Sequence, residues 1–170
     1  TVSGMSPWQK LLNFLFLSVS SRTAGFNTFD LNAMRGPTKL FVCMLMFVGA
    51  APGSTGGGIK VTTMIVLVST VWCALRGLSE VYILKHQIKK ATVYKALAIA
   101  ALAMVVCLTS AATVLQSFKT AGIPLWGIDG FFEAVSAFGT VGLSVGVSGA
   151  ATGGAKLALI FTMFFGRVGP

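Results

Sequence analysis

The chain has 170 residues, of which 55% are hydrophobic and 10% charged, and its mean hydropathy is +0.84. Soluble domains carry about 25% charged residues, so this composition excludes most water-soluble folds, disordered chains and disulfide-rich secreted domains. The 13 Lys and Arg residues outnumber the 4 Asp and Glu residues, for a net charge of +9. Because the basic residues lie between apolar runs, they indicate cytoplasmic loops of a membrane protein, and no nucleic-acid partner is expected.

The apolar runs have two lengths. A spanning helix needs about 20 apolar residues, whereas runs of about 10–14 indicate half-spans or re-entrant segments. In chain order the sequence holds a short run at 11–19, a long unit at 38–75 that the Gly-rich stretch 51–58 interrupts, a spanning helix at 96–115, a short run at 131–138 and a final helix from 156. We therefore predict an all-α integral membrane fold with re-entrant half-helices and one broken helix. The three cysteines lie inside apolar stretches and are expected to be buried free thiols.

The segment 76–95 sets the orientation of these helices. It holds the single acid Glu80 against Arg76, Lys85, His86, Lys89, Lys90 and Lys95. The positive-inside rule makes this segment a cytoplasmic loop. The helix at 96–115 then runs outward, the short run that ends at residue 138 dips in from outside, and the last helix returns inward.

An internal repeat becomes visible when the chain is shifted by 117 residues against itself. The matches keep their order across a short apolar run, a turn and the helix that follows, which is typical of internally repeated membrane proteins. The matched pairs are Pro7 and Pro124, Phe14 and Phe131, Thr23 and Thr140, Gly25 and Gly142, Gly36 and Gly153, Lys39 and Lys156, Leu40 and Leu157, Met46-Phe47 and Met163-Phe164, and Gly49 and Gly166.

Each repeat contains a T-x-G turn after its short run. The turns are Thr23-Ala24-Gly25-Phe26 and Thr140-Val141-Gly142-Leu143. Non-helical backbone at membrane depth leaves carbonyl groups without partners, at a cost of several kcal/mol each in lipid, and a dehydrated cation can supply the missing partner. The half-helices expected at 8–20 and 128–138 would aim their negative dipole ends at the same ion. A pair of ordinary interfacial turns is the alternative.

Three motifs stand in a specific order along the chain: Ser21-Arg22-Thr23-Ala24-Gly25-Phe26-Asn27, Pro52-Gly53-Ser54-Thr55-Gly56-Gly57-Gly58-Ile59-Lys60 and Ser136-Ala137-Phe138-Gly139-Thr140-Val141-Gly142-Leu143-Ser144. Together they resemble the Trk/Ktr/HKT superfamily of potassium transporters, in particular its bacterial Ktr-type (KtrB-like) membrane subunits. The resemblance covers the whole chain and implies four helix–pore loop–helix repeats around one pore. The chain looks like a fragment of that single pore domain. It would comprise the pore loop and broken second helix of repeat three (1–75), the cytoplasmic loop (76–95) and a truncated repeat four (96–170).

The resemblance implies a role for each motif. The two turns, residues 23–26 and 140–143, would be two of four selectivity-filter strands that hold K⁺ by their backbone carbonyls. The Gly-rich stretch would be an intramembrane gate loop formed by Gly53, Ser54, Thr55, Gly56, Gly57 and Gly58, with Lys60 next to it and Arg167 beside it on the cytoplasmic side. Two other interpretations of this stretch stay open. One is a nucleotide P-loop, although Ile59 separates Gly58 from Lys60, and the other is a small-residue packing site for a neighbouring helix.

Arg22 and Glu133 are expected to support the filter. Arg22 directly precedes the first turn and Glu133 lies in the second half-helix. Charges within apolar sequence usually face a partner or a cavity, so we predict that these two pair behind the filter and hold adjacent pore loops together. Asp30 and Asp129 are expected to be linker or cap residues.

These residues and the resemblance together imply a potassium-uptake pore subunit gated by the Gly-rich loop. An enzyme is not expected, because one histidine and four acids leave no catalytic constellation. No bound cofactor is expected; K⁺ is the transported ion, and Na⁺ is a candidate coupling ion because Ktr-type relatives use it. The resemblance implies a homodimer of the full-length subunit and a cytoplasmic nucleotide-binding ring, which the loop 76–95 would meet, in the bacterial cell membrane. The alternative is a non-conducting accessory subunit of a larger ion-transport complex.

Overall fold

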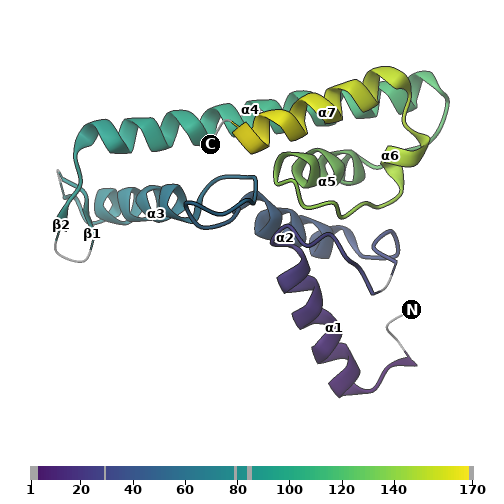
Figure 1. Cartoon of the computed structure of the whole chain (residues 1–170), viewed down its shortest axis with the longest axis horizontal. Helices are drawn as coiled ribbons and strands as arrows, with labels where there is room; N and C mark the ends of the chain where they lie inside the picture. The colour runs from purple at the N-terminus through teal and green to yellow at the C-terminus, as the bar shows by residue number, and fades with distance from the viewer. Residues whose placement is uncertain (1–3, 29, 79, 84–85, 169–170) are drawn as a thin grey trace.

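The computed structural model describes residues 4–28, 30–78, 80–83 and 86–168. Its elements are α1 (Pro7–Ser20), α2 (Gly36–Phe47), α3 (Val61–Leu75), β1 (Tyr82–Ile83), β2 (His86–Gln87), α4 (Lys90–Thr120), α5 (Gly127–Phe138), α6 (Val147–Ala150) and α7 (Gly153–Val168). The described chain is therefore mainly helical, as the sequence predicts. Helix α5 packs against α2, α4 and α7, whereas α1 projects away from the other helices (Figure 1).

The two short helices begin differently and end within one residue of equivalent positions. Helix α1 starts with a capping box, in which the Ser6 hydroxyl accepts from the Gln9 N–H and the Gln9 side chain accepts from the Ser6 N–H. Pro7 then supplies a backbone φ that suits the first helical residue. Helix α5 starts after Trp126 without a side-chain cap. Each helix ends just before its T-x-G turn, so the short helices predicted at 8–20 and 128–138 are confirmed.

The predicted broken helix is confirmed as α2 and α3, which residues 48–60 separate. We call these residues the Gly-rich loop. The two ends of the loop lie side by side: Val48 and Ile59 form a parallel bridge, and the Gly49 N–H donates to the Ile59 carbonyl at 2.8 Å. A helix, and not the strand that a P-loop requires, precedes the loop. The P-loop interpretation is therefore wrong.

The helix predicted at 96–115 is longer than expected. Helix α4 has 31 residues and is, within the described ranges, the one helix long and apolar enough to cross a membrane. It starts at Lys90, so the last part of the expected loop 76–95 belongs to the helix. In the remainder, β1 and β2 form an antiparallel hairpin. Lys85 lies outside the described residues.

The hairpin is tied to the loop that leads into it. The Glu80 carboxylate accepts hydrogen bonds from the Tyr82 hydroxyl, at 3.1 Å, and from the Gln87 amide. The hydrogen bond to Glu80, together with the negative charge of that carboxylate, raises the pKa of Tyr82 above its ordinary value. A two-residue strand is too short to give a periodic signal in sequence, so the hairpin could not be predicted.

The core surrounds α5. Phe132 and Phe138 of this helix are fully buried, as are Val114 of α4 and Met46 of α2. Because α5 belongs to the second repeat and α2 to the first, the two repeats share one core. The three cysteines are buried and free, as predicted.

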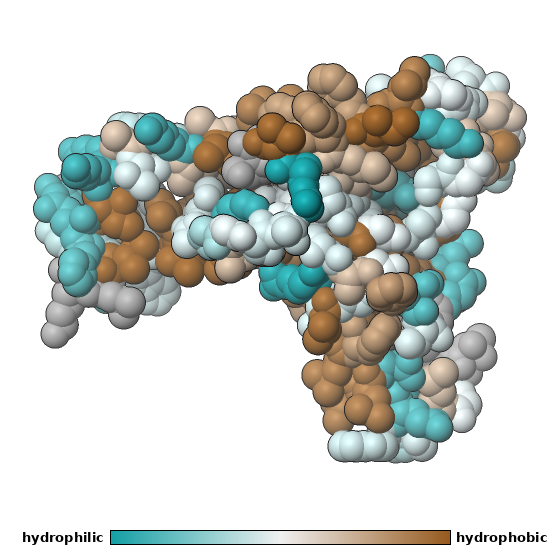
Figure 2. Space-filling model, viewed as in Figure 1, coloured by the Kyte–Doolittle hydropathy of each residue, from teal (hydrophilic) through white to brown (hydrophobic). Residues whose placement is uncertain are grey.

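Much of the outer surface is apolar. Trp8 and Val19 of α1 are 67% and 69% exposed, and α7 leaves Leu157 and Phe161 uncovered. Figure 2 shows brown, hydrophobic surface along α1 and α7, while the hairpin end is mainly teal. Exposed apolar surface on this scale marks contact with lipid or with further protein.

One buried ion pair joins the two repeats. The Lys39 Nζ in α2 lies 2.6 Å from the Asp129 Oδ1 in the first turn of α5, and the two side chains are 6% and 9% exposed. The expectation that Asp129 is a linker or cap residue is therefore wrong. The partners are 90 positions apart in the chain, so no local pattern connects them.

Removal of one partner of this pair should destabilise the protein. Lys39→Met or Asp129→Leu leaves one buried charge without its partner, at an expected cost of about 3–5 kcal/mol in the free energy of unfolding. The double variant removes both charges and should recover most of that loss. Thermal unfolding of the intact purified protein measures the three values. A double variant as unstable as the sum of the single variants would contradict the coupling.

Candidate functional site

The two T-x-G turns have the same backbone form and touch each other. The threonine and the glycine of each turn have positive φ: 69° and 74° for Thr23 and Gly25, 51° and 89° for Thr140 and Gly142. A Cβ placed on Gly25 would lie 2.5 Å from the Val141 carbonyl oxygen. This close approach of two backbones, together with the positive φ, requires glycine at position 25.

Positive φ at a threonine is strained, because its branched side chain is crowded in the left-handed region. The cost is about 1–3 kcal/mol per residue, and such strain concentrates at functional sites. The end of α5 holds the second turn in this form: the Thr140 N–H donates to the Ala137 carbonyl at 3.0 Å, and the Val141 N–H donates to the Ser136 carbonyl at 2.9 Å. The end of α1 binds the first turn in a similar way. The same strained form thus occurs twice, once in each repeat.

The helix ends beside the turns favour a cation, in contrast to the basic side chains nearby. Helices α1 and α5 both end here, and neither has a basic residue in its last turn. Two negative helix-dipole ends therefore lie beside the turns. Together with the carbonyl oxygens of non-helical backbone, they provide the kind of environment that stabilises a cation without its hydration shell.

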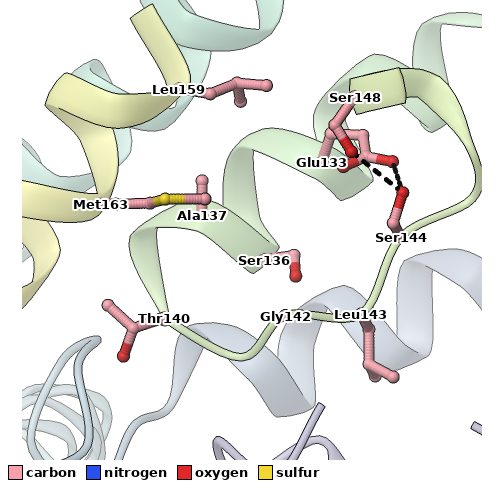
Figure 3. Close-up of a pocket in the computed structure, with 10 residues that line it drawn as sticks. All are labelled: Glu133, Ser136, Ala137, Thr140, Gly142, Leu143, Ser144, Ser148, Leu159 and Met163. Atoms are coloured by element: carbon pink, nitrogen blue, oxygen red, sulfur yellow. Dashed lines mark hydrogen bonds between the residues drawn. The ribbon is translucent and has the colours of Figure 1, made fainter. Parts of the chain in front are cut away.

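A cavity of about 240 Å³ lies next to the second turn, between α5, α7 and the segment that leads to α6 (Figure 3). Its lining mixes apolar side chains with hydroxyl groups: Ser136, Thr140, Leu143, Ser144, Leu159 and Met163. Glu133 lies at its wall and is buried. Because the turn has no packing neighbours on the side of the cavity, hydrogen bonds of the flanking chain are needed to fix its position.

Glu133 fastens the chain that follows the second turn. Its Oε1 accepts from the Ser144 hydroxyl at 2.5 Å, from the Val145 N–H at 3.0 Å and from the Val147 N–H at 3.3 Å. These donors replace the water that a buried carboxylate loses. Glu133 therefore ties α5 to residues 144–147 and constrains the turn between them.

The predicted pairing of Arg22 with Glu133 is wrong. The Arg22 Nη1 instead donates to the Val48 carbonyl at 2.5 Å and to the Gly49 carbonyl at 3.4 Å. Backbone amides satisfy the carboxylate, and backbone carbonyls satisfy the guanidinium. Arg22 thus bonds to the Gly-rich loop rather than to the neighbouring short helix.

Three basic side chains hold carbonyl groups of the Gly-rich loop. In addition to Arg22, the Lys60 Nζ donates to the Gly56 carbonyl at 2.8 Å, and the Arg167 Nη1 donates to the Thr55 carbonyl. The three donors come from the end of α1, the end of the loop itself and the last turn of α7. A loop without helical hydrogen bonds needs such partners, and charged donors bind more strongly than neutral ones.

The inner part of the loop rests on both turns. The Gly57 N–H donates to the Thr140 Oγ1 at 3.0 Å, and a Cβ on Gly57 would lie 2.7 Å from that oxygen. Position 57 therefore requires glycine for this contact. A Cβ on Gly56 would lie 3.2 Å from the Thr23 Oγ1. The structure thus brings the loop and the two turns together, as three sequence motifs that lie far apart in the chain.

The remaining predicted site residues differ in exposure. Gly53, Ser54 and Thr55 lie on the exposed side of the loop, whereas residues 56–58 are buried. In the turns, Phe26 is 70% exposed, whereas its repeat equivalent Leu143 is 2% exposed. In the second turn Val141 and Leu143 are buried while Gly142 is exposed, and the first turn is open on the side of Phe26.

Comparison with known proteins identifies the family. Residues 2–170 match the model of the TrkH family, described as cation transport protein. The chain belongs to this family. It is 40% identical over 161 residues to the Ktr system potassium uptake protein B of Bacillus subtilis and 36% identical over 170 residues to the protein of that name in Vibrio alginolyticus. It is 34% identical over 164 residues to the potassium/sodium uptake protein NtpJ of Enterococcus hirae.

These matches include 95% to 100% of the chain. The chain in turn spans about a third of the relatives, 35% of the Bacillus protein and 36% of the other two. The resemblance to the Trk/Ktr/HKT superfamily and its KtrB-like members is confirmed. The relatives are named as transport proteins, in agreement with the expectation of a function other than catalysis.

Glu133→Ala should destabilise the protein more than Glu133→Gln. Alanine leaves two buried N–H groups, of Val145 and Val147, without an acceptor, at about 1–3 kcal/mol for each, whereas glutamine keeps one oxygen. Thermal unfolding of the intact protein measures both losses.

A second comparison tests whether Arg22 and Glu133 pair with each other. Because they do not, the charge-swapped double variant Arg22→Glu/Glu133→Arg should be no more stable than its single variants. Recovery in the double variant would reinstate the pairing.

Proposed function

We propose that this chain forms part of a potassium-conducting pore, in which the two T-x-G turns are two strands of the selectivity filter. The observation that carries the proposal is the backbone contact between the turns at Gly25 and Val141. It is supported by the strained form that both turns share and by the dipole ends of α1 and α5 beside them. Two relatives that are 36% and 40% identical to the chain are named potassium uptake proteins.

In this proposal K⁺ enters the filter without its hydration shell. The carbonyl oxygens of residues 23–26 and 140–143 replace part of the lost water, and two further strands from the rest of the protein complete the ring. Binding must be strong enough for entry and weak enough for release. The membrane potential drives uptake and supplies about 2.3 kcal/mol per charge per 100 mV.

We further propose that the Gly-rich loop is the gate. The loop lies against both turns, so an ion that leaves the filter on this side meets the loop. Arg22, Lys60 and Arg167, which hold the loop, also place positive charge near the path and oppose a cation there. Conduction then requires displacement of the loop. The glycines of the loop allow the backbone to change form at low cost.

The complete protein is proposed to be a multi-pass protein of the bacterial plasma membrane. Helix α4 spans the bilayer, α2 and α3 together form a second, broken span, and the hairpin end with its basic residues faces the cytoplasm. A homodimer, a cytoplasmic nucleotide-binding ring and coupling to Na⁺ complete the proposal. They are supported by the resemblance to Ktr systems, and Na⁺ also by the name of the Enterococcus relative.

A non-conducting accessory subunit is the alternative function. It accounts for the apolar surface and for the basic cytoplasmic end. It gives no reason for two strained turns that touch each other, because a subunit with a purely structural role could pack through ordinary helices. The proposed pore accounts for both features, and ion flux through the purified full-length protein distinguishes the two functions.

Gly25→Ala and Gly142→Ala in the full-length protein should each lower potassium uptake at least about tenfold. Alanine would have to adopt positive φ at either position, which costs about 1–3 kcal/mol, and at position 25 its Cβ would also meet the Val141 oxygen. Rubidium and potassium flux into liposomes measures the effect. Gly154→Ala is the control, because its Cβ position has no atom within 4 Å, and its flux should equal that of the wild type. A wild type without flux would favour the accessory subunit.

Arg167→Met should raise potassium flux about threefold or more. The change removes the charged donor to the Thr55 carbonyl, a hydrogen bond of a class worth about 1.5–3 kcal/mol, and so destabilises the closed position of the loop. Lys119→Met, in the last turn of α4, removes a positive charge away from the loop and serves as the control. Unchanged flux in a folded Arg167→Met protein would contradict the role of the loop as a gate.

A further inference from the structure

The Thr140 side chain belongs to both parts of the proposed pore. The residue opens the second filter turn, and its Oγ1 accepts the hydrogen bond from the Gly57 N–H of the Gly-rich loop. It also lines the cavity beside the turn, at the end away from Glu133 (Figure 3). The proposed gate and the proposed filter are thus joined by one direct hydrogen bond.

The equivalent threonine of the first turn is bonded differently. The Thr23 hydroxyl donates to the Arg22 carbonyl at 2.6 Å, which is a contact within its own segment. Gly56 packs close to this hydroxyl, but the amide of the described loop that donates to a filter threonine is that of Gly57. The two threonines share sequence context and positive φ, but within the described residues the hydrogen bond from the loop amide goes to Thr140 and not to Thr23.

A single hydroxyl oxygen that accepts a hydrogen bond from an N–H group is a weaker ligand for a cation. The oxygen has two lone pairs, but the amide hydrogen carries partial positive charge and repels a cation that approaches the same oxygen. An ion at the end of the filter that faces the loop lies next to the first residue of each turn. Ion occupancy at that end and the Gly57–Thr140 hydrogen bond therefore compete.

On the basis of the proposed pore function, we propose that Thr140 is a positioning residue that couples the ion content of the filter to the position of the loop. K⁺ at the loop-facing end weakens the Gly57–Thr140 hydrogen bond, and the closed loop lowers the affinity for K⁺ at that end. Linkage makes the two effects equal in size. A loaded filter thus favours displacement of the loop, whereas an empty filter holds the loop in place.

Hydrogen exchange of the loop amides in the full-length protein tests this coupling. The exchange rate of a peptide that contains residues 53–60 is compared in potassium chloride and in N-methylglucamine chloride at equal ionic strength. Exchange should be about fivefold faster, or more, in potassium chloride. A peptide from the start of α4 serves as the internal control and should exchange equally in both salts.

Three variants assign the effect to one oxygen. Thr140→Val keeps the branched shape and removes the acceptor, so loop exchange should become faster and independent of K⁺. Thr140→Ser keeps the hydroxyl and should keep the dependence on K⁺. Thr113→Val removes a hydroxyl that bonds within α4, outside the filter and the loop, and should also keep the dependence on K⁺. If Thr140→Val does not fold, Thr140→Ala provides a second variant without the hydroxyl.

The outcomes separate this inference from the function on which it rests. A wild type that conducts K⁺ but shows K⁺-independent loop exchange overturns the coupling and leaves the pore intact. Equal dependence on K⁺ in the wild type and in the variants without the Thr140 hydroxyl also overturns it. A wild type that neither conducts nor binds K⁺ overturns the proposed function and the coupling together.

Discussion

Backbone that leaves the helical hydrogen-bond pattern inside an apolar protein must find other partners, and much of this chain is arranged around that constraint. The Gly-rich loop is the clearest case. Its carbonyls are held by charged side chains from three parts of the chain, and its inner amides donate to the Thr140 hydroxyl and, at 3.2 Å, to the Gly166 carbonyl. Charged and polar residues that are scattered in sequence converge here because the same few backbone groups need them.

The two repeats follow one plan but are completed to different degrees. The second helix of the first repeat, α2, packs against α5 of the second repeat. Helix α7 is the repeat equivalent of α2, and both helices leave apolar residues at equivalent positions exposed: Leu40 and Met44 in α2, Leu157 and Phe161 in α7. In the proposed pore these faces meet lipid or the rest of the protein. The two repeats differ at the end of their turns, where Leu143 is buried and its equivalent Phe26 is exposed.

Local signals account for the parts of the fold that sequence predicted. The lengths of the apolar runs and the cluster of glycines predicted both short helices and the broken helix, because these features depend on neighbouring residues. The start of α4 is not predictable in this way, because lysines in the first turn of a helix look like those of a loop. The three motifs that contain the turns and the loop carry the resemblance to one family.

The contacts of the charged residues were predictable only in part. The positions of Lys60 and Arg167 beside the loop followed from the resemblance. The partners of Arg22 and Glu133 did not, because a sequence shows a charge but not the backbone group that meets it. The Lys39–Asp129 pair joins residues on different repeats, and its register depends on how α2 meets α5.

That ion pair also bears on how the protein is made. Lys39 leaves the ribosome 90 residues before Asp129, and α2 is only 12 residues long. An unpaired lysine in the middle of a membrane costs about 2.5–3.5 kcal/mol on insertion scales. The acid that neutralises Lys39 therefore exists only once the second repeat has been made. Burial of this lysine depends on the docking of α5 against α2, so the first repeat reaches its final packing only together with the second.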